Sequence, residues 1–109
     1  MKLVLVCYSG SSASILRDRM LAWARDNLLD VEIIVSSLAG LDEDKEDADI
    51  VLVGPQVRCA LASVRERVPE RIPVMAVDTR DYGMAKGDRV MQAALDEIRQ
   101  YKEQKIHME

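Results

Sequence analysis

The sequence predicts a single α/β domain in which helices cover both faces of a four-stranded parallel sheet. Three observations favour this class: short apolar runs rich in Val, Ile and Leu, helix-period segments between them, and a length of 109 residues. Near-continuous apolar strands are typical of a parallel sheet that is buried on both faces. Right-handed crossovers then favour a small doubly wound sheet, for which we predict the strand order 2-1-3-4.

The four predicted strands are the apolar runs, taken in chain order, and charged or turn-forming residues flank them. These runs cover residues 2–7, 31–36, 48–53 and 73–77. The acidic segment between the second and third strands, residues 37–47, predicts a solvated loop or one short turn of helix.

The three predicted helices are the segments whose apolar residues recur at helical spacing. They cover about residues 13–29, 56–67 and 87–103. Gly54 and Pro55 mark the turn into the second helix, because proline suits an initial helical position. The pair Tyr82-Gly83 precedes the third helix. We expect residues 1–102 to form the domain and residues 103–109 to be a frayed tail.

Composition and charge exclude several classes of function. Hydrophobic residues make up 49% and charged residues 31%, as in ordinary soluble domains. The net charge of −4 shows no general electrostatic footprint for nucleic acid, so no such partner is expected. No apolar stretch approaches the roughly 18 residues that span a bilayer, so we expect no direct membrane insertion.

The cysteine count favours a reduced, cytoplasmic setting, because two cysteines are too few for a disulfide scaffold. Cys59 is expected to pack within a helix. No cluster of His, Cys, Asp and Glu in the sequence has metal-ligand spacing, so we predict no metal and no cofactor.

The most informative segment follows the first strand. Cys7 ends that strand, and the next residues are mostly small and rich in donors: Tyr8, Ser9, Gly10, Ser11, Ser12, Ala13 and Ser14. In parallel sheets, ligands bind beyond the carboxyl ends of the strands. Backbone N–H groups before a helix converge on anions, and the helix dipole favours thiolate. We therefore predict an exposed, reactive, anion-facing thiol, although free cysteine is also among the most buried residue types.

Residues after the third and fourth strands should border the same edge of the sheet. Gln56 either donates to a phosphoryl oxygen or caps the second predicted helix. Asp78, Asp81 and Tyr82 follow the fourth strand, where an aspartate is more often a turn former than an acid catalyst. Arg58 is a nearby cation, but exposed helix arginines are usually solvated.

Phosphatases and arsenate reductases use a similar strand, loop and helix with the pattern Cys-x5-Arg. Here the arginine position is Ala13. Without a fixed guanidinium, the loop lacks the group that clamps a phosphoryl group in its transition state. This disfavours ester hydrolysis. Accepting a phosphoryl group and transferring it to another molecule requires fewer catalytic groups than hydrolysis does. It requires a thiolate in line with the bond that breaks, and hydrogen-bond donors for the phosphoryl oxygens.

Three motifs together resemble the enzyme IIB component of the lactose/cellobiose family of bacterial sugar phosphotransferase systems. They are the run from Cys7 to Ser14, the run Leu52-Val53-Gly54-Pro55-Gln56-Val57, and Val77-Asp78 with Tyr82-Gly83. The similarity extends over about residues 2–100. It implies a four-stranded parallel sheet, similar to the low-molecular-weight tyrosine phosphatase and flavodoxin-like architectures. Family loops commonly have a bulky residue at position 11 and threonine at position 13, where this chain has Ser11 and Ala13.

The resemblance implies a phosphocarrier. Cys7 would accept a phosphoryl group from a phosphohistidine on the IIA component, and residues 8–14 would hold it. A β-linked disaccharide of the cellobiose, chitobiose or lactose class, bound by the membrane-embedded IIC component, would receive it. The chain would be cytoplasmic and reach the membrane through IIC. Gln56, Asp78 and Tyr82 are secondary site candidates. Two alternatives stay open: a IIB-like regulatory module that signals its phosphorylation state, and a thiol-based phosphatase.

Overall fold

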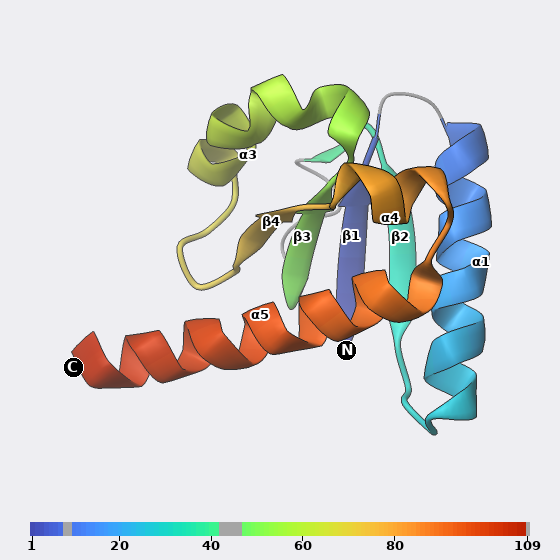
Figure 1. Ribbon diagram of the computed structural model, residues 1–109. Helices are drawn as coiled ribbons and strands as arrows, with labels where there is room; N and C mark the ends of the chain where they lie inside the picture. Colours follow the sequence, from blue (N-terminus) through green and yellow to red (C-terminus); the bar gives the residue numbers. More distant parts are fainter. Residues whose placement is uncertain (8–9, 42–46, 109) are drawn as a thin grey trace.

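Four parallel strands form one sheet in the computed structural model, which describes residues 1–7, 10–41 and 47–108, apart from the side chains of 10–12 and 104–108. The strands are β1 Lys2–Val6, β2 Glu32–Ser36, β3 Ile50–Val53 and β4 Val74–Ala76. Their order is β2-β1-β3-β4, so the predicted fold class and strand order are confirmed (Figure 1).

The register of the sheet brings the carboxyl ends of the strands to one edge. Val6 at the end of β1 lies beside Ser36 on one side and Val53 on the other, and Val53 lies beside Ala76. The turns that leave β1, β3 and β4 are therefore neighbours in space. This edge, called the carboxyl edge below, holds the predicted site.

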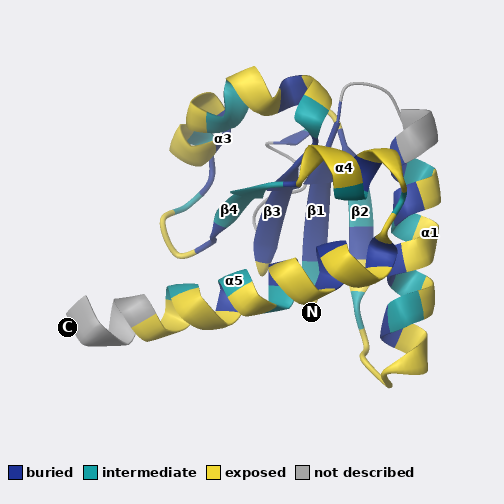
Figure 2. Ribbon diagram, viewed as in Figure 1, coloured by how far each residue is buried: buried dark blue, intermediate teal, exposed yellow. Residues whose placement is uncertain are grey.

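The two faces of the sheet carry side chains of different size. Successive residues of a strand point to opposite faces, so larger and smaller side chains that alternate in the sequence are separated. The larger side chains of β1 and β3 pack with α1 (Gly10–Asp26), α4 (Thr79–Gly83) and α5 (Gly87–Met108). The valines of the same strands pack with the 3-10 helix η1 (Pro55–Ala60) and with α3 (Leu61–Arg67). Figure 2 shows β1 and β3 buried between these helices, which have many exposed residues.

The helices differ from the sequence predictions in their bounds. α1 begins at Gly10 instead of 13, and α5 continues to Met108 instead of ending near 103. The second predicted helix is two elements, η1 and α3, which meet at Ala60, where the backbone angles are φ −93° and ψ 6°. Within η1, Val57 has non-helical angles of φ −117° and ψ 20°. The short α4 was not predicted. The acidic residues 42–46 lie outside the described residues.

A close approach between α1 and α5 sets the position of α4. A side chain at Gly87 would place its Cβ only 2.5 Å from the backbone carbon of Arg19 and the nitrogen of Met20. Glycine therefore lets the start of α5 lie directly on α1, which holds the preceding α4 over the carboxyl edge (Figure 1). None of the described helices is long and apolar enough to cross a bilayer.

Candidate active site

Cys7 lies at the carboxyl edge of the sheet, directly after β1. Its backbone N–H donates to the carbonyl of Ser36 at 2.9 Å, which extends the pairing of β1 with β2 by one residue. The side chain is only 3% exposed and belongs to the apolar cluster that includes Ala13, Leu16 and Tyr82. The position of Cys7 agrees with the sequence prediction. The predicted exposure of its sulfur is wrong.

The protonation state of Cys7 also differs from the expectation. Burial raises the pKa of the Cys7 thiol above its ordinary value, because an apolar surrounding disfavours the charged thiolate. The direction of this shift is opposite to the lowering that was expected from the α1 N-terminus. The resting sulfur is therefore a neutral thiol at neutral pH.

The residues expected to bind phosphate do not form one loop. Tyr8 and Ser9 lie outside the described residues. Residues 10–14, predicted as loop up to 12, are the first residues of α1. The first N–H groups of an α-helix have no carbonyl partner within that helix, and the helix dipole adds positive potential there. The backbone after Cys7 thus offers donors for an anion, while the phosphate-binding role itself stays a prediction.

Ala13 occupies the position where a Cys-x5-Arg cradle has its arginine. It is 0% exposed and lies in the same apolar cluster as Cys7. A guanidinium at this position would be buried among apolar side chains, where an unpaired charge is strongly unfavourable. The fold thus explains why this chain has no such clamp.

Gln56 and Tyr82 are brought to the end of β1 by the glycine that follows β3. The N–H of Gly54 donates to the carbonyl of Val6 at 2.9 Å. A Cβ on Gly54 would lie 3.0 Å from Gln56 Oε1, 3.3 Å from the Val6 oxygen and 3.4 Å from Tyr82 Cε2. Both side chains therefore flank the residue before Cys7. The alternative that Gln56 caps a helix is wrong, because Gly54 is the N-cap of η1 and no side chain caps it.

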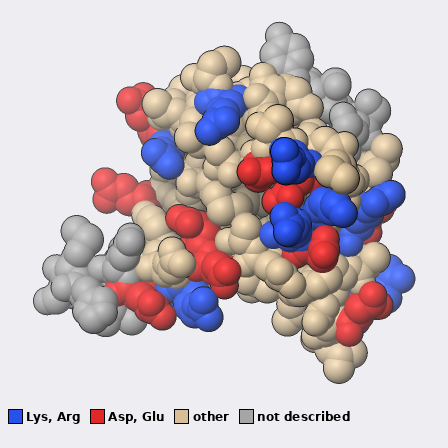
Figure 3. All heavy atoms as spheres, in the orientation of Figure 1, with Lys and Arg blue, Asp and Glu red and all other residues tan. Residues whose placement is uncertain are grey.

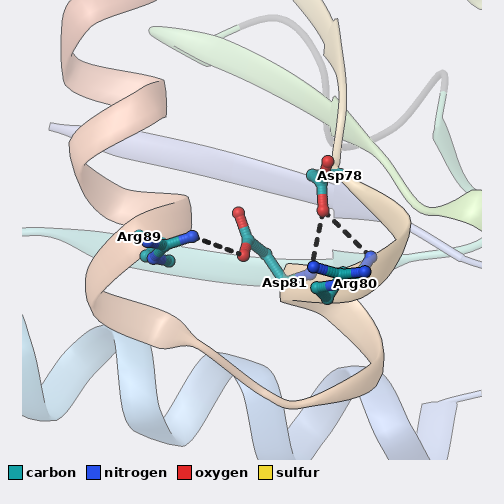
Figure 4. Close-up of polar contacts among 4 residues, drawn as sticks. All are labelled: Asp78, Arg80, Asp81 and Arg89. Atoms are coloured by element: carbon teal, nitrogen blue, oxygen red, sulfur yellow. Dashed lines mark hydrogen bonds and ion pairs between the residues drawn. The ribbon is translucent and has the colours of Figure 1, made fainter.

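Asp78 is the N-cap of α4. Its Oδ1 accepts hydrogen bonds from the backbone N–H groups of Arg80 at 2.9 Å and Asp81 at 3.0 Å (Figure 4). This confirms the turn-forming interpretation of the strand-end aspartate. A part for Asp78 in phosphoryl transfer stays a prediction. In the described part of the chain, no group of three or more His, Cys, Asp and Glu could hold a metal ion.

A charged hollow lies at the same edge, beyond β4, and the sequence reasoning did not find it. Its volume is about 620 Å³, and its lining includes Arg58 of η1, Asp78, Arg80 and Asp81 of the α4 turn, and Arg89 of α5. We call it the arginine pocket. Asp81 pairs with Arg89 at 3.6 Å (Figure 4). Figure 3 shows basic side chains gathered over α4 and the start of α5.

Known proteins resemble this chain in sequence and in fold. The family model described as the lactose/cellobiose specific IIB subunit of the PTS system matches residues 2–93. The cellobiose-specific EIIB component of Lactococcus lactis subsp. lactis is 34% identical over an alignment of 98 residues, which covers 84% of this chain and 91% of that protein. The oligo-beta-mannoside-specific EIIB component of Bacillus subtilis is 33% identical over 95 residues, 86% of this chain and 92% of that protein.

Solved structures agree with this assignment. The cellobiose-specific phosphotransferase IIB component from Borrelia burgdorferi superposes with a TM-score of 0.77 and 29% identity, covering 93% of this chain and 94% of that one. The lactose-specific IIB domain from Streptococcus pneumoniae has a TM-score of 0.74 at 17% identity, covering 89% and 96%, and supports the fold alone.

The parallel α/β sheet with a cysteine at the end of its central strand is the architecture of a phosphoryl carrier of the IIB type. The chain belongs to the lactose/cellobiose-specific IIB family of sugar phosphotransferase systems. The resemblance drawn from the three sequence motifs is thereby confirmed. Components of this family are phosphotransferases that work with IIA and IIC partners, so this chain is a phosphocarrier of such a system.

Proposed function

We propose that Cys7 carries the phosphoryl group, which it accepts from a phosphohistidine of a IIA component and passes to a β-linked disaccharide held by a IIC component. The observation that carries this proposal is the position of Cys7. It directly follows the central strand β1, and α1 begins at Gly10. Gln56 and Tyr82 lie beside Gly54, whose N–H donates to the carbonyl of Val6, the residue before Cys7. The other cysteine, Cys59, is exposed in η1.

The first transfer exchanges a nitrogen–phosphorus bond for a sulfur–phosphorus bond. A lone pair of Cys7 Sγ attacks the phosphorus in line with the bond to the histidine nitrogen, and that bond breaks with its electron pair going to the imidazole. The thiol loses one proton and the leaving imidazole gains one. The reaction is therefore balanced in protons when the thiol starts neutral, which is the state that burial favours.

The burial of the sulfur sets a condition on this step. With 3% of Cys7 exposed, the phosphorus of a donor cannot approach Sγ in line until the surrounding residues separate. Docking of the donor must supply that opening. Backbone N–H groups in the first turn of α1 then face the phosphoryl oxygens, where donors stabilise charge without an arginine.

The second transfer reverses the roles of the groups. A sugar hydroxyl oxygen attacks the phosphorus, the sulfur–phosphorus bond breaks, and Cys7 leaves as the sulfur anion, which regains a proton. We infer a sugar of the cellobiose, chitobiose or lactose class. Relatives at 33–34% identity are named for cellobiose, galactose and oligo-beta-mannoside, which supports assigning the choice of sugar to IIC. The chain would then act at the cytoplasmic face of the membrane.

A reconstituted relay tests the proposal. Phosphorylated IIA of the same system is mixed with the chain and with vesicles that contain its IIC, and sugar phosphate is measured with cellobiose, chitobiose and lactose. We expect sugar phosphate with the wild-type chain and with Cys59→Ser, and none with Cys7→Ser. A chain that is phosphorylated but never supports sugar phosphate formation would instead be the regulatory module. Steady hydrolysis of an aryl phosphate would favour the phosphatase.

A further inference from the structure

The arginine pocket is lined by more positively charged than negatively charged side chains. Three guanidinium groups face two carboxylates. Asp78 already accepts two backbone hydrogen bonds, and Asp81 pairs with Arg89. Arg58 and Arg80 form no ion pair with any described residue. The chain as a whole carries −4, so this concentration of arginine runs against the overall charge.

The pocket is close to Cys7 but separate from it. Val6, Val53 and Ala76 are neighbours in the register, so the turn after β4 lies two strand spacings, about 10 Å, from the turn after β1. This exceeds the Debye length of about 8 Å at physiological ionic strength, so the pocket is expected to act on a partner that covers both turns and not on Cys7 itself. Tyr82 links the two, because it extends from α4 into the apolar cluster that contains Cys7.

Chemistry indicates what such a pocket recognises. Guanidinium groups bind carboxylates and phosphates through paired hydrogen bonds, and arginine is enriched where proteins meet. The lining comes from three separate elements, η1, the α4 turn and α5, so it presents a broad surface. A partner that delivers a phosphoryl group to Cys7 must cover this edge and arrives with about two negative charges on that group.

We propose that the arginine pocket is a docking surface for an acidic face of the phosphorylated IIA donor, next to the donor's phosphohistidine. This inference rests on the proposed function and adds to it the residues that attract the donor. Charges at the rim of an interface act mainly on the association rate and its salt dependence.

The test compares two double variants that lower the net charge by the same amount. Arg58→Gln/Arg80→Gln removes the two arginines without an ion pair from the pocket. Arg25→Gln/Arg65→Gln is the matched control, with one exposed arginine in the last turn of α1 and one in the last turn of α3, neither of them in an ion pair with a described residue. The rate at which Cys7 gains a phosphoryl group is measured against the concentration of phosphorylated IIA, at low and high ionic strength.

We expect the pocket variant to raise the KM for the donor about three- to twentyfold, with kcat unchanged and a shallower dependence on salt. The control should match the wild type. Equal KM values for both double variants would overturn the proposal, and so would a loss of kcat at constant KM. Saturable binding of inorganic phosphate to the pocket, with no change in donor KM, would identify a small-anion site instead. A wild-type chain that accepts no phosphoryl group would overturn the proposed function itself.

Discussion

Two turns at the same edge of the sheet differ in the polarity of the side chains that surround them. The turn after β1 places Cys7 among apolar side chains, and burial keeps its thiol neutral. The turn after β4 is capped by Asp78 and surrounded by Arg58, Arg80 and Arg89 at an open surface. The two differ in charge and in exposure although they lie about two strands apart.

Under the two proposals above, this difference separates reaction from recognition within a small domain. The buried sulfur would react only with a docked partner, and the exposed arginines would attract that partner. The predictions below test whether each turn depends on its own surroundings, and they run from the largest expected effect to the smallest.

Placing an arginine in the cysteine turn should have the largest effect. Ala13→Arg introduces a guanidinium at a position that is 0% exposed, so the free energy of unfolding should fall by about 3 kcal/mol or more. Denaturant unfolding measures this change. The control Ala13→Ser adds only a hydroxyl and should cost about 1 kcal/mol. An Ala13→Arg chain as stable as the wild type would show that this side of α1 opens freely to solvent.

The two cysteines should differ in reactivity. At neutral pH the exposed Cys59 should react with iodoacetamide at least about tenfold faster than Cys7, measured in the single-cysteine variants Cys7→Ser and Cys59→Ser. Because burial raises its pKa, the rate at Cys7 should keep increasing with pH beyond the ordinary pKa of a cysteine. Equal rates at neutral pH would contradict the burial described for Cys7.

The same shift has a consequence for stability. The folded state holds the Cys7 proton more tightly than the unfolded state, so its contribution is complete below the ordinary cysteine pKa. That contribution is lost as the pH rises through the raised value. The loss of stability on going to alkaline pH should therefore be smaller in Cys7→Ala than in the wild type.

Removing the cap of α4 should have a moderate effect. Asp78→Ala deletes the acceptor for two backbone N–H groups, which should lower the free energy of unfolding by about 1 kcal/mol. Asp78→Asn is the matched control, because asparagine caps helices as well as aspartate does. If Asp78→Asn keeps its stability but loses phosphoryl acceptance, Asp78 has a chemical role beyond capping.

The smallest effect is expected from the ion pair in the arginine pocket. Asp81→Asn removes the partner of Arg89, whose side chain is 67% exposed, so stability should change by less than about 0.5 kcal/mol. The KM for the phosphorylated donor should fall slightly, because the pocket becomes more positive. A rise in KM would contradict attraction between the pocket and an acidic partner.

The sequence predicted what depends on local pattern. The apolar runs identified all four strands, and crossover rules gave their order. The spacing of apolar residues did not predict that α1 begins at Gly10, because the first turn of this helix has no apolar residue before Ala13. It also missed α4, which has only five residues. There the aspartate at 78 was the available signal, since Asp before a short polar run is a good N-cap.

The rest of the site depends on contacts between distant segments. Local reasoning from the α1 N-terminus predicted an exposed thiolate, but Cys7 is buried in the apolar cluster that also contains Leu16 and Tyr82. Arg58, Arg80 and Arg89 come from three separate elements and meet only because β3 and β4 are neighbours in the sheet. Each arginine alone looks like an ordinary solvated residue, so no sequence pattern marks the pocket.

Mapping the phosphoryl group within the intact chain tests the identity of the carrier residue most directly. The chain is incubated with phosphorylated IIA, digested at a pH where sulfur–phosphorus bonds survive, and its peptides are weighed. A single phosphoryl group on the peptide that contains Cys7, with none in Cys7→Ser, is the expected result. Finding that group on Cys59 or on His107 instead would contradict the assignment.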